Sequence, residues 1–264
     1  MEGISIIIPV FNKIETTVRC IDSIRQWNKG CSFEIIIVDN GSTDATQQTF
    51  TAGAGFKPVP TSEQITYIRN TENLGVAKAL NLGAESAKYD ILCFMHNDVF
   101  IHKEKWVSEI CNFIFNTPTP GVVGLFGAKT IREDASFRGK SIVYAKRVSA
   151  AKNKPFEKVA VVDGLLMAMK KTVFKDVGGF CEDFYVHYYD KDISLRAFRH
   201  GLNNYVVDIP FEHICGATRN QISRDDIIRD EAQRQFVEKW KDYLPVDVST
   251  WGDKITYIFR KGIL

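Results

Sequence analysis

The chain has 264 residues, 45% of them hydrophobic, which is enough for one large α/β domain or two closely packed lobes. Its 34 lysines and arginines nearly balance its 32 aspartates and glutamates, so the formal net charge of +2 argues against nucleic acid as a partner. The sequence lacks a secretory signal, a membrane-spanning apolar stretch and any closely spaced cysteine pair, which predicts a cytoplasmic protein with reduced thiols that contacts a membrane, if at all, at its inner face.

Four apolar, β-branched runs in the first half of the chain predict a mainly parallel central sheet flanked by helices. Strands that are buried on both faces lose the alternation of polar and apolar residues, and these runs lack that alternation. The predicted strands are Ile4–Val10, Glu34–Val38, Ile65–Arg69 and Asp90–Met95. Helices are predicted around Val18, Ile21 and Ile24, at Asp44–Phe50, and from near Gly75 to Ala87. The predicted fold class is therefore α/β, with a doubly wound first half.

A break at residues 116–121 (NTPTPG) predicts a boundary between two halves, residues 1–118 and 119–264. The second half has a less regular pattern. Strands are predicted at Val122–Ala128 and Ala160–Met169, and helices at Lys170–Val177 and Asp192–His200. Residues 131–156 show no pattern that favours either kind of element.

An apolar stripe at helical spacing marks the C-terminal residues. Its members are Trp251, Ile255, Ile258 and Phe259, and basic residues surround it. The stripe predicts a helix that docks on the core or on a dimer partner, and peripheral membrane contact is the alternative.

The turn after the first strand excludes two common ways of binding a nucleotide. Dinucleotide enzymes place a glycine-rich turn there, whereas residues 11–15 (FNKIE) contain no glycine, and no P-loop motif is present. The phosphates of a bound nucleotide would need another positive charge, which a divalent metal held by carboxylates would supply. Asp39 and Asp98 each end a predicted strand, at the sheet edge where ligands bind. The alternative for Asp39 is that its carboxylate satisfies its own tight turn.

Five sequence blocks carry a resemblance to a known family. In chain order they are SIIIPVFN, IIIVDNGSTDAT, RNTENLGVAKALNLG, ILCFMHNDVF and VDGLLMAMKKTVFKDVGGFCEDF, the last of which runs into YYDKDISLRA. From Ser5 to about Thr218 the chain resembles the family 2 inverting glycosyltransferases, which have the GT-A fold. The resemblance implies one GT-A catalytic domain. Residues 1–118 would bind the nucleotide-sugar, and residues 119–264, with C-terminal helices, would bind the acceptor.

The same resemblance implies the donor-binding residues. They are Pro9, Phe11 and Asp39 around the nucleobase, Arg69, Asn73, Gly75 and Lys78 around the nucleotide and its diphosphate, Asn97 and Asp98 at the metal motif, and Asp163 and Gly164 facing the donor sugar. A carboxylate at Asp39 would favour uracil or thymine, which offer an imide N–H. Lys78 has the equally weighted alternative of a solvated helix face. Residues 180–188 are implied to form part of the acceptor wall.

The implied metal ligands are Asp98 and His213. Asp98 matches the final acid of the family's D-x-D motif, and His96 replaces the first acid. The alternative for His96 is a hydrogen-bonded histidine at the end of a strand. The alternative for His213 is a core histidine, and the neighbouring Gly216 and Thr218 favour the ligand.

The implied catalytic base is Asp190, just ahead of the predicted helix Asp192–His200. Inversion by one direct displacement needs one carboxylate that deprotonates the acceptor hydroxyl. The acid that usually precedes this base is replaced by Tyr189. Asp192 competes for the role, but an acid near a helix start is typical of a cap or a dipole partner.

Together these residues imply an inverting, metal-dependent glycosyltransferase, with Mn²⁺ or Mg²⁺ as its cofactor. It would move a hexose, N-acetylhexosamine or deoxyhexose from a UDP- or dTDP-sugar to a glycan, lipid-linked or protein acceptor. The departures at His96 and Tyr189 leave open a domain that binds nucleotide-sugar without turnover. A sugar-nucleotide pyrophosphorylase is disfavoured, because it would need a glycine-rich basic loop after the first strand.

Overall fold

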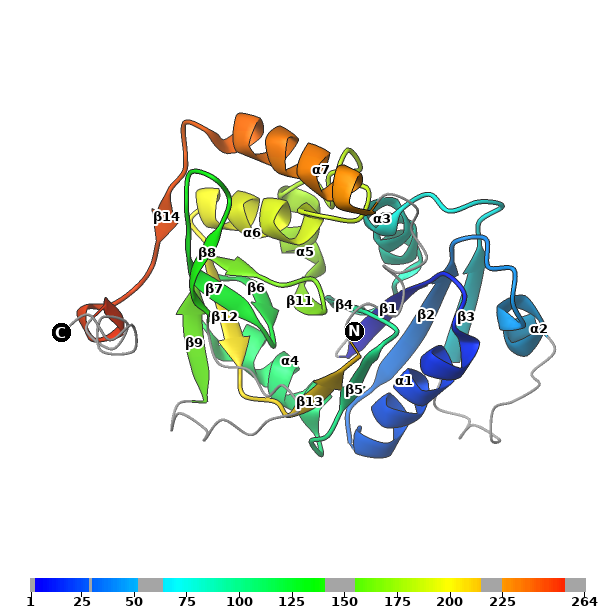
Figure 1. Ribbon diagram of the computed structural model, residues 1–264. Helices are drawn as coiled ribbons and strands as arrows, with labels where there is room; N and C mark the ends of the chain where they lie inside the picture. Colours follow the sequence, from blue (N-terminus) through cyan, green and yellow to red (C-terminus); the bar gives the residue numbers. More distant parts are fainter. Residues whose placement is uncertain (1–2, 29, 52–63, 141–154, 215–224, 255–264) are drawn as a thin grey trace.

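The computed structural model describes residues 3–28, 30–51, 64–140, 155–214 and 225–254 (Figure 1). Ile255, Ile258 and Phe259 of the predicted C-terminal stripe lie outside these ranges, as do Gly216 and Thr218. Trp251, the remaining member of the stripe, lies in a described helical turn and is 84% exposed. Among the described residues, no helix is both long enough and apolar enough to cross a membrane.

The four strands predicted for the first half are confirmed and form one side of an eight-stranded sheet. They are β1 (Ile4–Val10), β2 (Phe33–Asp39), β3 (Gln64–Arg69) and β4 (Ile91–Met95). β1 pairs in parallel with β2 and β4, and β2 pairs in parallel with β3. Their carboxyl ends therefore lie along one edge, which carries Asp39 and the turn that follows Met95.

Strands from the second half extend the same sheet. The strand order is β3-β2-β1-β4-β11-β6-β12-β9. The added strands are β11 (Leu166–Lys170), β6 (Pro120–Gly124), β12 (Asn203–Val207) and β9 (Phe156–Val159). β11 runs antiparallel to both β4 and β6, so the sheet is mixed. Segments on both sides of residue 118 thus share one sheet.

Two strands predicted for the second half are each split in the structure. The segment Val122–Ala128 contains the end of β6 and the start of β7 (Gly127–Ile131), which belong to different sheets. The segment Ala160–Met169 contains β10 (Val161–Val162) and then β11. Because β10 pairs with β7 and β11 pairs with β4, the chain changes sheets between them. Hydrophobic pattern does not mark this change, since the residues on both sides of it are buried.

Two smaller sheets complete the strand arrangement. β8 (Phe137–Lys140) and β14 (Val246–Asp247) pair with β7 beside β10. β5 (Val99–Ile101) and β13 (Phe211–His213) form an antiparallel pair in which His213 lies opposite Val99. This pair brings His213 next to the turn after β4.

Helices cover both faces of the eight-stranded sheet (Figure 1). α1 (Ile14–Trp27) and α4 (Trp106–Asn116) pack on the face that carries Ile6 and Ile8. The opposite face, which carries Ile7, is covered by α3 (Val76–Ser86), α5 (Lys171–Asp176) and α6 (Tyr189–Arg199), and α7 (Asp225–Trp240) packs on the outside of α6. The short α2 (Thr46–Thr51) lies beside β3, where Phe50 stacks on Tyr67.

The start of α6 corrects the predicted helix boundary. The helix begins at Tyr189, three residues before the predicted start at Asp192, because Tyr188 takes a positive φ of 68° and serves as the N-cap. The Asp192 N–H donates to the Tyr188 carbonyl at 2.9 Å. Asp190 therefore lies inside the first turn of α6 and not ahead of the helix.

Candidate metal and donor site

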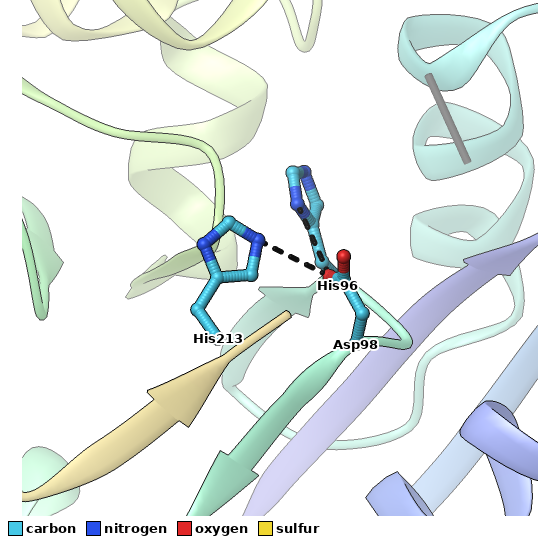
Figure 2. Close-up of side chains that lie close together, drawn as sticks. All are labelled: His96, Asp98 and His213. Carbon is cyan, nitrogen blue, oxygen red and sulfur yellow. Dashed lines mark ion pairs between the residues drawn. The ribbon is translucent and has the colours of Figure 1, made fainter. Parts of the chain in front are cut away.

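Three side chains that can ligate a metal meet at the carboxyl end of β4. His96 and Asp98 come from the turn between β4 and β5, and His213 comes from the end of β13 (Figure 2). His213 Nε2 lies 3.3 Å from Asp98 Oδ1, and His96 Nδ1 lies 3.9 Å from the same oxygen. The candidate ligand atoms of all three residues lie within 4.8 Å of one another. The structure thus brings the predicted ligands Asp98 and His213 together and adds His96.

The donor set fits a divalent metal ion. The Asp98 side chain is 8% exposed, and its buried Oδ1 accepts no hydrogen bond from the described residues, although His213 Nε2 lies within ion-pair distance of it. A buried carboxylate oxygen without a donor is costly unless a cation satisfies it. The two imidazoles remain 29% (His96) and 23% (His213) exposed, so the cluster is open on one side. One carboxylate and two imidazoles are ligand types that divalent transition metals accept.

Asn97 was predicted to contact the nucleotide-sugar donor, but its side chain points toward helix α1. Its Nδ2 donates to the Thr17 hydroxyl of α1 at 2.9 Å, and the residue is 4% exposed. This bond fixes the turn between β4 and β5 to α1. Because Asp98 is the next residue in that turn, the bond also helps to fix the backbone of Asp98.

The two positions that depart from the family's acids contact each other. His96 Nε2 lies 2.9 Å from the hydroxyl of Tyr189 at the start of α6. This contact joins residues that are 93 positions apart, and nothing in the sequence signals it. It places the three candidate metal ligands, His96, Asp98 and His213, next to the first turn of α6, which carries Asp190.

The Asp190 carboxylate is held by two backbone N–H groups. Its Oδ2 accepts from Gly164 at 3.0 Å and its Oδ1 accepts from Lys191 at 2.9 Å. Asp190 is 8% exposed and lies near Asp163, so two of the predicted site residues share one buried region. Burial raises the pKa of Asp163, the charge of Asp190 adds to this effect, and the hydrogen bond from the Leu165 N–H opposes it.

Asp192 is not the cap of α6, which is Tyr188, but it lies in the first turn of that helix, where a dipole partner was the other expectation. Its fully buried carboxylate accepts from Arg196 Nε at 2.8 Å and from Trp240 Nε1 at 3.1 Å. Lys239 Nζ lies 2.7 Å from the same group. These contacts hold α7 on α6, so Asp192 faces α7, while the Asp190 carboxylate binds the backbone that connects β10 to β11.

The predicted nucleobase residue Asp39 lies at the end of β2 and is fully buried. Its Oδ1 accepts the N–H of Ser42 at 2.8 Å, which is the turn contact that the sequence left as the alternative. Its Oδ2 accepts from the Tyr67 hydroxyl at 2.5 Å and pairs with the Arg69 guanidinium. Pro9 and Phe11 are half-buried at the end of the neighbouring strand β1.

The predicted donor-binding residues after β3, Asn73 and Gly75, contact Tyr185 in the segment that precedes α6. Gly75 has a φ of +83°, and a Cβ at this position would overlap the ring of Tyr185. Asn73 accepts the Gly75 N–H at 3.0 Å, and its carbonyl accepts from the Tyr185 hydroxyl at 2.9 Å. Lys78 is exposed on α3, in line with its solvated alternative.

The acceptor-wall prediction for residues 180–188 is wrong for two aromatic side chains. Phe180 and Phe184 are each 2% exposed and belong to the core. Phe180 contacts Phe94 with ring centroids 4.7 Å apart, and Phe184 contacts Phe236 at 6.1 Å. Their rings are part of the hydrophobic core and do not form a surface that an acceptor could contact.

Comparison with known proteins places these observations in one family. The family model described as glycosyl transferase family 2 matches residues 5–178. The poly-beta-1,6-N-acetyl-D-glucosamine synthase of Staphylococcus epidermidis is 28% identical over 182 residues, which cover 67% of this chain and 42% of that protein. Glycosyltransferase AglE of Haloferax volcanii is 29% identical over 115 residues, covering 43% of this chain and 36% of that one. The chain therefore spans less than half the length of these curated relatives.

Solved structures show the same fold at low sequence identity. GalNAc-T7, crystallised with UDP, GalNAc and Mn²⁺, gives a TM-score of 0.62 at 14% identity and covers 81% of this chain and 44% of that one. The mannosyltransferase PcManGT from Pyrobaculum calidifontis, in complex with GDP-Man and Mn²⁺, gives 0.59 at 16% identity and covers 99% and 80%. With the family model spanning most of the chain and this sheet arrangement beneath it, the chain belongs to glycosyl transferase family 2 and has the GT-A fold.

Proposed function

We propose that this protein transfers a sugar from a UDP- or dTDP-sugar to an acceptor hydroxyl, in one metal-dependent step that inverts the anomeric carbon. The observation that carries the proposal is the convergence of side chains from both halves of the chain. His96 and Asp98 come from the turn after β4, whereas His213 comes from the end of β13 and Asp190 from the first turn of α6. The 2.9 Å contact between His96 and Tyr189 joins these two groups.

Asp98 and His213 would hold the divalent cation, Mn²⁺ or Mg²⁺. When bound, such an ion offsets the negative charge that develops on the departing diphosphate. The buried Oδ1 of Asp98, which accepts no hydrogen bond from the described residues, supports this assignment.

Asp190 would act as the base. Its carboxylate takes the proton of the acceptor hydroxyl while the acceptor oxygen bonds to the anomeric carbon and the bond to the diphosphate oxygen breaks. The N–H groups of Gly164 and Lys191 fix the direction of this carboxylate. Because it is held by backbone, the base needs no partner acid at position 189.

The nucleobase would lie at the carboxyl ends of β1 and β2, beside Pro9, Phe11 and Asp39. We propose that Arg69, which pairs with Asp39, and the turn of Asn73 and Gly75 border the nucleotide and its diphosphate. Lys78 would extend this border, and Asp163 and Gly164 would face the donor sugar near Asp190. The acceptor is proposed to be a glycan, a lipid-linked sugar or a protein side chain.

The test is nucleoside-diphosphate release from a panel of UDP-, dTDP- and GDP-sugars, with Mn²⁺, Mg²⁺ or EDTA, and with pooled acceptors of the three classes. Release from one UDP- or dTDP-sugar that stops with EDTA and in Asp98→Ala is the expected result. Release from a GDP-sugar alone would overturn the proposed donor. Metal-dependent UDP binding without release, from any donor and with every acceptor, would favour a binding domain without turnover.

A further inference from the structure

The hydroxyl of Tyr189 is held in a fixed position next to the three candidate metal ligands, His96, Asp98 and His213. Tyr189 is 3% exposed, and its ring packs edge-on against Phe180 with centroids 5.6 Å apart. Residue 164 is a glycine, and a Cβ there would overlap the Tyr189 hydroxyl. The backbone thus leaves room for an oxygen at this point, and that oxygen lies 2.9 Å from His96 Nε2.

The contact decides which nitrogen of His96 faces the metal cluster. A neutral imidazole carries one N–H and one lone pair, and the hydrogen bond at one nitrogen fixes the role of the other. Nε2 is directed at Tyr189, and Nδ1 is directed at Asp98, 3.9 Å from Oδ1. That distance is too long for a hydrogen bond but suits two ligands of one ion.

We propose that Tyr189 is a positioning residue: its hydroxyl oxygen accepts the Nε2–H of His96 and so presents the Nδ1 lone pair of His96 as a third metal ligand. The inference rests on the proposed metal site and adds to it the ligand that replaces the missing acid. Ligating histidines usually donate their second N–H to an acceptor that fixes the tautomer, and loss of such an acceptor costs about 10- to 100-fold in metal affinity.

The resulting donor set has a consequence for metal choice. Two imidazoles and one carboxylate suit Mn²⁺ and Co²⁺ better than Mg²⁺, which prefers oxygen ligands and gives up its water reluctantly. We therefore expect this chain to bind Mn²⁺ more tightly than Mg²⁺ in the absence of any nucleotide.

The experiment is a double-mutant cycle on the full chain, read by Mn²⁺ titration with electron paramagnetic resonance and without nucleotide. Tyr189→Phe keeps the ring and removes only the oxygen, and it should weaken Mn²⁺ binding about 10- to 100-fold. His96→Ala should weaken binding at least as much. The double variant should be no weaker than His96→Ala, because Tyr189 acts through His96.

Tyr205→Phe makes the same chemical change in an aromatic cluster on β12 and serves as the matched control, with native Mn²⁺ affinity expected. The absorption bands of bound Co²⁺ should shift in Tyr189→Phe and not in the control. Native Mn²⁺ affinity in a folded Tyr189→Phe, or losses that multiply in the double variant, would overturn the inference while the proposed function stands. If the unmodified chain binds no Mn²⁺, both this inference and the proposed metal dependence fail.

Discussion

Asp192→Asn should lower stability and leave the chemistry intact. The Asp192 carboxylate is fully buried and meets Arg196, Lys239 and Trp240. The asparagine amide removes the negative charge that Arg196 and Lys239 face. Its NH2 group would also point at the N–H donors of these residues and of Trp240, which it cannot accept from. Removing one partner of a buried ion pair costs about 3–5 kcal/mol. Because the Lys239 side chain is 38% exposed and regains water, we expect the lower end, about 3 kcal/mol.

A loss of that size should lower the thermal midpoint by about 6–12 °C in a chain of this length. The assay is thermal and urea unfolding of Asp192→Asn, together with sugar transfer measured well below the midpoint. Asp226→Asn, at an α7 side chain that is 84% exposed, is the matched control and should leave both readouts unchanged. A native midpoint combined with lost transfer would refute the reasoning, since it would make Asp192 the acid that takes part in catalysis.

Three further predictions concern other parts of the molecule. Mn²⁺ at about 100 times its Kd should stabilise the native chain by about 2.7 kcal/mol and Asp98→Ala by far less, which thermal unfolding with and without Mn²⁺ checks; equal gains would contradict the metal assignment. Gly75→Ala should cost about 1–3 kcal/mol or more, because its φ of +83° and ψ of 168° suit only glycine and its Cβ would overlap Tyr185; it should also weaken UDP binding in calorimetry, and native affinity would separate this turn from the donor site. Burial alone would raise the pKa of Asp253, but its hydrogen bonds, with Lys129 foremost, lower it to about 2. Its contribution is therefore present above about pH 3.9 and is lost as the pH falls toward 2, so urea midpoints of the native chain and Asp253→Asn should converge over that window; a constant gap would contradict the assignment.

The parallel half of the sheet could be predicted from the sequence because its strands are buried on both faces. Runs such as Ile4–Val10 carry no polar interruption, and only a fully covered strand tolerates that pattern. The same property hid the change of sheets at Asp163 and Gly164, because both flanking strands are equally apolar. Local pattern reports burial, and it does not report which strand lies alongside.

Helix α4 has an apolar face that is recognisable in the sequence, although this helix was not predicted. Trp106, Ile110 and Ile114 recur at helical spacing and are fully buried. Helix α7 is different, because its sequence is rich in charge and only a few of its residues are buried. Its position depends on Trp240 meeting Asp192, a contact between distant segments that spacing cannot show.

For the site, the sequence placed Asp98, His213 and Asp190 by resemblance, and the structure brings Asp98 and His213 together. The position of His96 beside Asp98 and its contact with Tyr189 could not be predicted. In the sequence, His96 and Tyr189 are two separate departures from the family's acids. The structure relates them, because their side chains lie 2.9 Å apart. Paired changes of this kind become visible only when the fold brings the turn after β4 next to the start of α6.

The most direct test of the account compares Asp190→Asn with the unmodified chain in two measurements made on the same samples. One is calorimetric binding of the nucleoside diphosphate in the presence of Mn²⁺, and the other is the rate of sugar transfer from the donor that the release panel identifies. If Asp190 is the base, binding stays near the native affinity while transfer falls by at least 10²-fold, the smaller end of the usual contribution of a general base. Transfer at the native rate in a folded Asp190→Asn that still binds the nucleotide would contradict the account.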